Sequence, residues 1–232
     1  MYAADVMDCP AWAYEDGESL RIADADEKMT GLFTRHRRNR KQMKFHYGGK
    51  FKTDADFKSP GKHHEGAVAF REPSQKVFAV VANVGCIIVL FLLLVLTFFL
   101  SGKSFLEFSP WISLAAILSM LTLLPHEVLH AACFREDVYL YYDLSKLLVF
   151  VHGTESMSKR RFIFMSLLPN VVFGGIPFVL FLFNHNWSLL GMIGAFCISM
   201  GFGDYINVFT ALTQMPRRAK TYLYDFHSYW YV

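Results

Sequence analysis

The sequence lacks two features that mark exported, disulfide-stabilised proteins. Its four cysteines show no paired spacing, and three of them lie in apolar stretches, so no disulfide framework is predicted. The N-terminus has no basic region followed by an apolar core, so we do not expect a cleaved signal peptide. Together these absences argue against a small secreted scaffold and favour a chain with free thiols.

Charge is almost missing from four long stretches in the last two thirds of the chain. The only charged residue in the second stretch is Glu127, the only one in the fourth is Asp204, and no Lys or Arg lies in any of them. Each stretch is long enough to cross a bilayer, which takes about 20 apolar residues. The sequence therefore predicts an all-α membrane protein with four transmembrane helices, at residues 77–100, 111–134, 162–183 and 187–212.

Lys and Arg are distributed unequally between the two sides of these helices. Fourteen precede the first helix, five lie in the loop 135–161 and three follow Leu212, whereas only Lys103 falls on the other side. Because such an excess marks the cytoplasmic side, we expect both termini in the cytoplasm of a multi-pass protein of a bacterial cell membrane. Residues 1–76 are predicted to be a polar cytoplasmic extension, in part disordered, and residues 77–232 the membrane domain.

The second predicted helix carries a short pattern of chemically active side chains. His126, Glu127 and His130 form the motif His-Glu-x-x-His, which places two imidazoles about one turn apart on one helix face. Two such histidines can hold one zinc ion, and the glutamate can take a proton from metal-bound water. Since a charge at membrane depth is costly and marks function, we predict a zinc site inside the membrane.

Polar groups on two other helices lie at the depth of this motif. His126, Asp204 and Asn170 are each eight residues from the cytoplasmic end of their predicted helix, which is roughly 12 Å at 1.5 Å per residue. Asp204 has no basic partner within the helices, so it is the candidate third zinc ligand beside His126 and His130. Asn170 and Asn207 are candidates for orienting that carboxylate by hydrogen bonds.

The loop 135–161 is unusually apolar for a connection between membrane helices. Residues 138–142 and 147–151 are rich in β-branched and aromatic side chains, which predicts a β-hairpin that dips into the membrane beside the zinc helix. Its edge could pair with an extended substrate, or the loop could be a lid or an interfacial helix without substrate contact. Three loop residues stay open as rival third ligands: Asp143, His152 and Glu155.

Two polar motifs of the extension are assigned no catalytic role. The basic run 35–41 suits anionic lipid headgroups, but it lacks the interleaved aromatic residues typical of nucleic-acid binding. No nucleic-acid partner is therefore expected. His63, His64 and Glu65 are adjacent in the sequence, and adjacent side chains point different ways on a regular element, so we expect surface residues rather than metal ligands.

Four stretches of the sequence resemble a membrane family labelled putative zincin peptidases; they are residues 126–130, 153–162, 203–207 and 226–230. More remotely, the zinc motif and the later aspartate are similar to those of site-2 intramembrane metalloproteases, which cleave membrane-embedded substrates. The remote resemblance implies His126 and His130 as zinc ligands and Glu127 as general base. It also implies Asp204 as third ligand, although the Leu-Asp-Gly usual in that family is Gly-Asp-Tyr here.

Three functions are compatible with these observations. The first is an intramembrane zinc endopeptidase acting on membrane-embedded or membrane-associated proteins. The alternative is a membrane metalloprotein without proteolysis, such as a scaffold or metal-handling protein; a transporter is disfavoured because the outer halves of the helices are almost wholly apolar. A membrane-tethered nucleic-acid binder would rest on charge alone. We favour the protease, and the oligomeric state and the substrate stay open.

Overall fold

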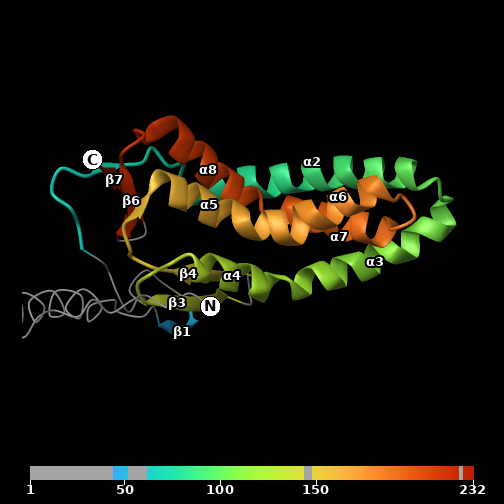
Figure 1. Cartoon of the computed structure of the whole chain (residues 1–232), viewed down its shortest axis with the longest axis horizontal. Coiled ribbons are helices and arrows are strands. Elements are labelled where there is room, and N and C mark those ends of the chain that lie inside the picture. The colour runs from blue at the N-terminus through green and yellow to red at the C-terminus, as the bar shows by residue number, and fades with distance from the viewer. Residues whose placement is uncertain (1–43, 52–61, 144–147, 225–226) are drawn as a thin grey trace, which may run out of the picture. The chain divides into compact units, whose positions relative to one another are not determined.

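The computed structural model describes residues 44–51, 62–143, 148–224 and 227–232 (Figure 1). The chain divides by spatial contacts into residues 1–41 and 42–232. All described residues belong to the second unit. The basic run 35–41, for which lipid contact was predicted, lies outside the described residues.

Apolar helices make up most of this unit. They are α2 (Gln75–Ser101), α3 (Phe105–Leu121), α4 (Leu123–Ala132), α5 (Lys159–Pro169), the π-helical turn η4 (Asn170–Gly175), α6 (Ile176–Phe183), α7 (Ser188–Met200) and α8 (Phe202–Gln214).

Three helical stretches are long and apolar enough to cross a membrane: α2, α3 with α4, and α5 through α6. The bent pair α7 and α8 makes a fourth if it counts as one span. Large apolar side chains on α2 are exposed, including Ile87 at 66% and Phe99 at 73%. Exposed apolar surface of this extent is typical of a face that contacts lipid or another apolar partner. The prediction of membrane-length helices is thus confirmed for three and, with the bent pair, for four.

Three of the four predicted helices are irregular, by a break, a π-helical turn or a bend, and each irregularity has a local cause. Pro125 has no N–H to give to the carbonyl of Leu121, and α3 ends at that residue. The turn η4 follows Pro169 in the same way. At Gly201, where α7 and α8 bend by 51°, an added Cβ would lie 1.5 Å from Oδ1 of Asn170. Only glycine fits there, and the fourth predicted helix is two helices.

Two small sheets lie at the end of the helices where α4 ends and α5 begins (Figure 1). One has the order β1-β3-β4, with β1 parallel to β3; the other is antiparallel with the order β2-β7-β6-β5. The strands are β1 (Phe45–Lys50), β2 (Val68–Ala69), β3 (Val138–Asp143), β4 (Leu148–His152), β5 (Met157–Ser158), β6 (Lys220–Tyr224) and β7 (His227–Tyr231).

The sheets modify the all-α prediction. The hairpin predicted in the loop 135–161 is present as β3 and β4, which pair antiparallel. The other strands lie outside that prediction. The strands β1, β2 and β5 each pair with a strand distant in the sequence, as Phe45 does with Val138. The strands β6 and β7 are neighbours in the chain and pair with each other, and the sequence reasoning missed them. The all-α fold class therefore holds for the membrane-length helices alone.

The part of the chain predicted as a cytoplasmic extension contributes to both sheets through β1 and β2. Phe70 is buried in a cluster with Ala211 and Met215. The Tyr222 hydroxyl accepts the backbone N–H of His64 at 3.1 Å and lies 3.1 Å from Nδ1 of His63. These histidines thus pack beside β6 and β7.

A topology with both chain ends on one side of the membrane predicts opposite labelling at two exposed positions. With all four native cysteines replaced by Ala, Glu65→Cys should react with an impermeant maleimide only in inside-out vesicles. Asn186→Cys, between α6 and α7, should react only in intact cells, because positively charged segments stay in the cytoplasm. Reaction of both positions from one side would contradict the topology.

Candidate metal centre

The two histidines of the His-Glu-x-x-His motif lie beside each other on α4. The ring centroids of His126 and His130 are 4.8 Å apart. Their side chains are 17% and 12% exposed, respectively. The imidazoles therefore share one face of α4, as their four-residue spacing requires.

Asp204 reaches the same point from α8. Its Oδ2 lies 3.2 Å from Nε2 of His126, and its Oδ1 lies 3.5 Å from Nε2 of His130. The bend at Gly201 places Asp204 in the first turn of α8, where the positive end of the helix dipole stabilises a carboxylate. One ligand atom from each of the three side chains lies within 4.8 Å of the others. The fold thus brings together the three candidate ligands.

Asn170, on the turn η4, holds the Asp204 carboxylate. Its Nδ2 donates hydrogen bonds to Oδ2 of Asp204 at 2.8 Å and to the carbonyl of Ser166 at 3.0 Å. Asn207, the other residue proposed to orient Asp204, instead lines a separate cavity. It makes no hydrogen bond to Asp204 within the described ranges. Of the two asparagines, Asn170 is the one positioned to orient the carboxylate.

A backbone carbonyl fixes the tautomer of His130. Nδ1 of His130 lies 3.0 Å from the carbonyl oxygen of Met165 on α5. Because a carbonyl only accepts hydrogen bonds, Nδ1 carries the proton, and Nε2 of the neutral ring presents its lone pair toward Asp204. This arrangement is the usual one for a metal-binding histidine.

The carbonyl of Met165 is available because of a proline. In a regular helix it would accept the N–H of the residue four positions later, but that residue is Pro169, which has no N–H. The sequence reasoning missed this contact. A proline within a predicted membrane helix is the signal that could have found it, because it marks a carbonyl that needs another donor.

The donor set of the site fits zinc. Two imidazole nitrogens and one carboxylate are a common set of protein ligands in catalytic zinc sites, with water in the fourth position. Bonds of about 2.0–2.1 Å in a tetrahedron put neighbouring ligand atoms about 3.3 Å apart. Oδ2 of Asp204 lies 3.2 Å from Nε2 of His126 and Oδ1 lies 3.5 Å from Nε2 of His130, and one ligand atom from each residue lies within 4.8 Å of the others. Nε2 of His130 and Oδ1 of Asp204 are both acceptors and cannot hydrogen-bond to each other. A cation between them would be bound by both.

Glu127 is held by the hairpin. Its Oε2 accepts the backbone N–H of Val151 at 2.9 Å. Since β4 is an edge strand of the described sheet, this N–H points away from β3 and toward α4. The other carboxylate oxygen, Oε1, has no hydrogen-bond partner in the described part of the chain. The motif glutamate is therefore fixed at one oxygen and open at the other.

The segment that carries these residues can be compared with known families. Residues 119–220 match the model of the family described as "Putative zincin peptidase". The match covers the motif, Asn170 and Asp204, and it confirms the resemblance drawn from the sequence. A zincin family implies zinc and suggests a metallopeptidase. Searches of the curated proteins and of the solved structures found no match to the chain.

Within the matched segment, the rival ligands of the loop are placed elsewhere. Asp143 and His152 are buried on β3 and β4, 5% and 3% exposed, and neither joins the metal-capable group found among the described residues. Glu155 accepts the backbone N–H groups of Arg135 at 2.5 Å and Glu136 at 3.1 Å. Its carboxylate is thus bound to the backbone just after α4, and it is not in the metal-capable group found among the described residues.

Glu155 also ties α4 to α5. It pairs with Arg161 on α5, whose Nε donates to the carbonyl of Cys133 at the end of α4 at 2.9 Å. Arg161 and Met165 are about one turn apart on α5. Their partners Cys133 and His130 are also about one turn apart, at the end of α4. The Glu155–Arg161 pair therefore sets the register in which Met165 meets His130.

The charge of Glu155 predicts a pH-dependent contribution to stability. Burial opposes ionisation, but the hydrogen bonds from Arg161 and from two backbone N–H groups outweigh it and hold the pKa of Glu155 below its ordinary value. A carboxyl with a lowered pKa stabilises the fold above its unfolded pKa of about 4.3, and that stability is lost as pH falls through the folded pKa.

Glu155→Gln should therefore lower the thermal unfolding midpoint at pH 7, by an amount corresponding to roughly 1–2 kcal/mol. The difference from wild type should shrink as the pH falls below about 4. The matched control is Glu136→Gln, an exposed neighbour that should change the midpoint little. A constant difference at all pH values would show that the effect does not arise from the charge.

The zinc assignment predicts the metal content of single variants. Purified protein should hold about one zinc per chain, and His126→Ala or His130→Ala should abolish it. Asp204→Ala should reduce zinc affinity about 10-fold or more, a loss at least as large as removing an outer hydrogen-bond partner. Asp143→Ala, His152→Ala and Glu155→Ala are the comparison set. If Asp204→Ala kept full zinc while one of these lost it, the loop would supply the third ligand.

Proposed function

We propose that this protein is an intramembrane zinc metalloprotease that hydrolyses peptide bonds of membrane-embedded or membrane-associated proteins. The observation that carries the proposal is the convergence of His126, His130 and Asp204 beside Glu127, on helices of membrane length. The family match supports the peptidase class. The depth of the motif in its helix supports a substrate that is reached within the membrane.

The protein residues provide the proton transfers of such a reaction. Zinc, when bound by the two histidines and Asp204, supplies an acidified water and polarises the scissile carbonyl. Glu127 takes the proton at Oε1, because Oε2 is already held by Val151, and passes it to the leaving amine. Asn170 and the Met165 carbonyl keep Asp204 and His130 oriented during these steps.

The hairpin supplies a means of presenting an extended substrate. A peptide bond in a membrane helix is shielded by the helix's own hydrogen bonds, so a helical substrate must be extended before cleavage. Val149 lies two residues before Val151, so its backbone groups point to the same outer side of β4. An extended segment pairing with this edge would run beside Glu127. We include this pairing in the proposal.

The test is proteolysis by a variant that keeps the metal. Glu127→Gln preserves the shape of the side chain and its hydrogen bond from Val151, but an amide cannot accept the proton. Cleavage of a panel of single-span membrane peptides in detergent should fall at least about 100-fold, the lower range for loss of a general base. Zinc content should stay unchanged, and Glu65→Gln, an exposed control, should cleave as wild type does.

The same experiment distinguishes the protease from a metalloprotein without proteolytic activity. If wild-type protein binds zinc but cleaves none of the panel, and no membrane protein of the cell changes when the protein is removed, a non-proteolytic metalloprotein becomes the better description. An active Glu127→Gln variant would instead point to a different base.

A further inference from the structure

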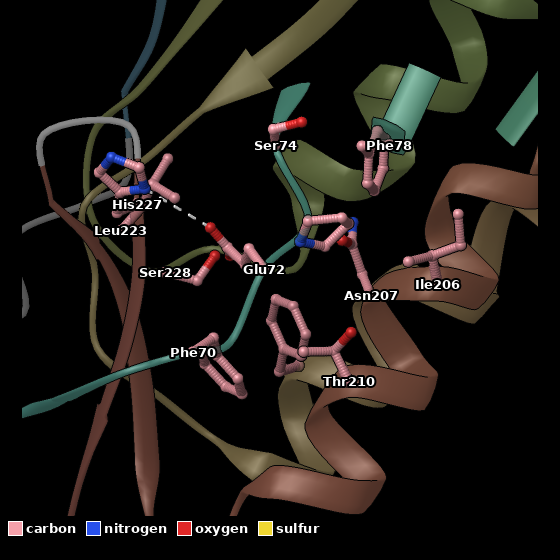
Figure 2. A pocket seen from close by; sticks show the side chains of 12 residues that line it. Phe70, Glu72, Ser74, Phe78, Ile206, Asn207, Thr210, Leu223, His227 and Ser228 are labelled. Atoms are coloured by element: carbon pink, nitrogen blue, oxygen red, sulfur yellow. Dashed lines mark ion pairs between the residues drawn. The ribbon is translucent and has the colours of Figure 1, made fainter. Parts of the chain in front are cut away.

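A cavity of about 560 Å³ lies where α2 begins, and it is separate from the residues of the metal centre. Figure 2 shows Glu72 between the residues of β7 and those of α8. The volume is within the usual range of small-molecule pockets. The lining residues used below are Glu72, Ser74, Phe78, Phe162, Asn207, Thr210, His227 and Ser228.

The cavity lies near one end of the membrane-length helices. Phe78 is three residues into α2, Phe162 is three residues into α5, and Thr210 is four residues before the end of α8. At 1.5 Å per residue, all three are about 5 Å inside the same ends of the membrane-length helices. A ligand here would have its polar end at the membrane boundary and its apolar end among the chains.

Among the described residues that line the cavity, Glu72 is the only acidic one and none is Lys or Arg. Oε2 of Glu72 lies 3.7 Å from Nδ1 of His227, and the Glu72 side chain is 33% exposed. Hydroxyl and amide groups of Ser228, Asn207 and Thr210 line the rest. This wall suits an ammonium group that donates hydrogen bonds to Glu72, together with an oxygen-rich group that accepts them from its neighbours.

The apolar part continues into a second cavity of about 430 Å³ between α2 and α8. The two cavities share Pro73, Ile206 and Thr210 as lining residues. The second is further lined by the apolar Val81, Phe202 and Phe209, and also by Arg71 and Gln214. A polar pocket that leads into an apolar slot has the two-part character of an amphiphile that spans the membrane boundary.

We propose that these joined cavities bind a phospholipid with a primary-amine headgroup, of the phosphatidylethanolamine class. The ammonium pairs with Glu72, and the phosphate lies toward Ser74 and the positive N-terminal end of α2. One acyl chain follows the slot between α2 and α8. A lipid with an anionic headgroup and no amine would place negative charge against Glu72, and no Lys or Arg is among the described residues that line the first cavity around it. A choline headgroup has no N–H to donate.

Lipid titration of the full-length protein tests this site independently of zinc chemistry. Delipidated protein in detergent is titrated with ethanolamine, glycerol and choline phospholipids of identical chains, with bound lipid counted by native mass spectrometry. The ethanolamine lipid should bind most tightly. Glu72→Gln should weaken it roughly 3- to 10-fold, the effect of one partly exposed charge-assisted hydrogen bond, and should remove its advantage over the other two.

Three further measurements complete the test. Glu65→Gln, an exposed acidic control outside the cavity, should bind all three lipids as wild type does. Thr210→Trp, which fills the junction of the two cavities, should weaken all three while zinc content and unfolding midpoint stay near wild type. Free phosphoethanolamine, which has no acyl chain, should bind far more weakly than the lipid. Equal wild-type affinity for the three lipids, or an unchanged Glu72→Gln, would overturn the proposal and leave the metal centre unaffected.

Discussion

The hydrogen bond from Nδ1 of His130 to the carbonyl of Met165 is the interaction on which the metal centre depends. It exists because Pro169 leaves that carbonyl without its helical partner, and inside a membrane an unsatisfied carbonyl costs several kcal/mol. Pro169 thus leaves the Met165 carbonyl without a donor, and His130 supplies one. The contact also leaves the lone pair of Nε2 free for the candidate metal and joins α5 to α4, so one missing backbone donor affects both the packing and the orientation of a candidate ligand.

The same rule accounts for the placement of Asp204. A carboxylate within membrane-length helices needs partners, and no Lys or Arg lies in the four predicted helices. Asp204 is surrounded instead by two imidazoles and the amide of Asn170. Asn170 can approach only because position 201 is glycine, and the same glycine is the point where α7 gives way to α8. The bend at Gly201, the amide of Asn170 and the carboxylate of Asp204 therefore depend on one another.

The sequence predicted the features that depend on neighbouring residues and missed most of those that depend on residues far apart in the chain. Helix positions and the motif depend on residues near one another, and the apolar helices, the His-Glu-x-x-His face and the β3–β4 hairpin are found as expected. The parallel pairing of Phe45 with Val138 depends on residues far apart in the chain, which no local pattern reports. Asn207 was predicted to orient Asp204 from its spacing along the helix alone. The side chain instead lines a cavity beside β7, because the bend at Gly201 and the neighbouring strands determine what each face of α8 contacts.

The metal centre and the lipid cavity are bounded by the same two helices. On α5, Phe162 lines the cavity and Met165, one turn later, holds His130. On α8, Asp204 faces the histidines while Thr210 lines the cavity. A ligand shifts a site elsewhere only as far as it binds two arrangements of the connecting elements with different affinity. A lipid that fits one spacing of α5 and α8 therefore changes zinc affinity only if that spacing also changes the distance from Asp204 to the imidazoles.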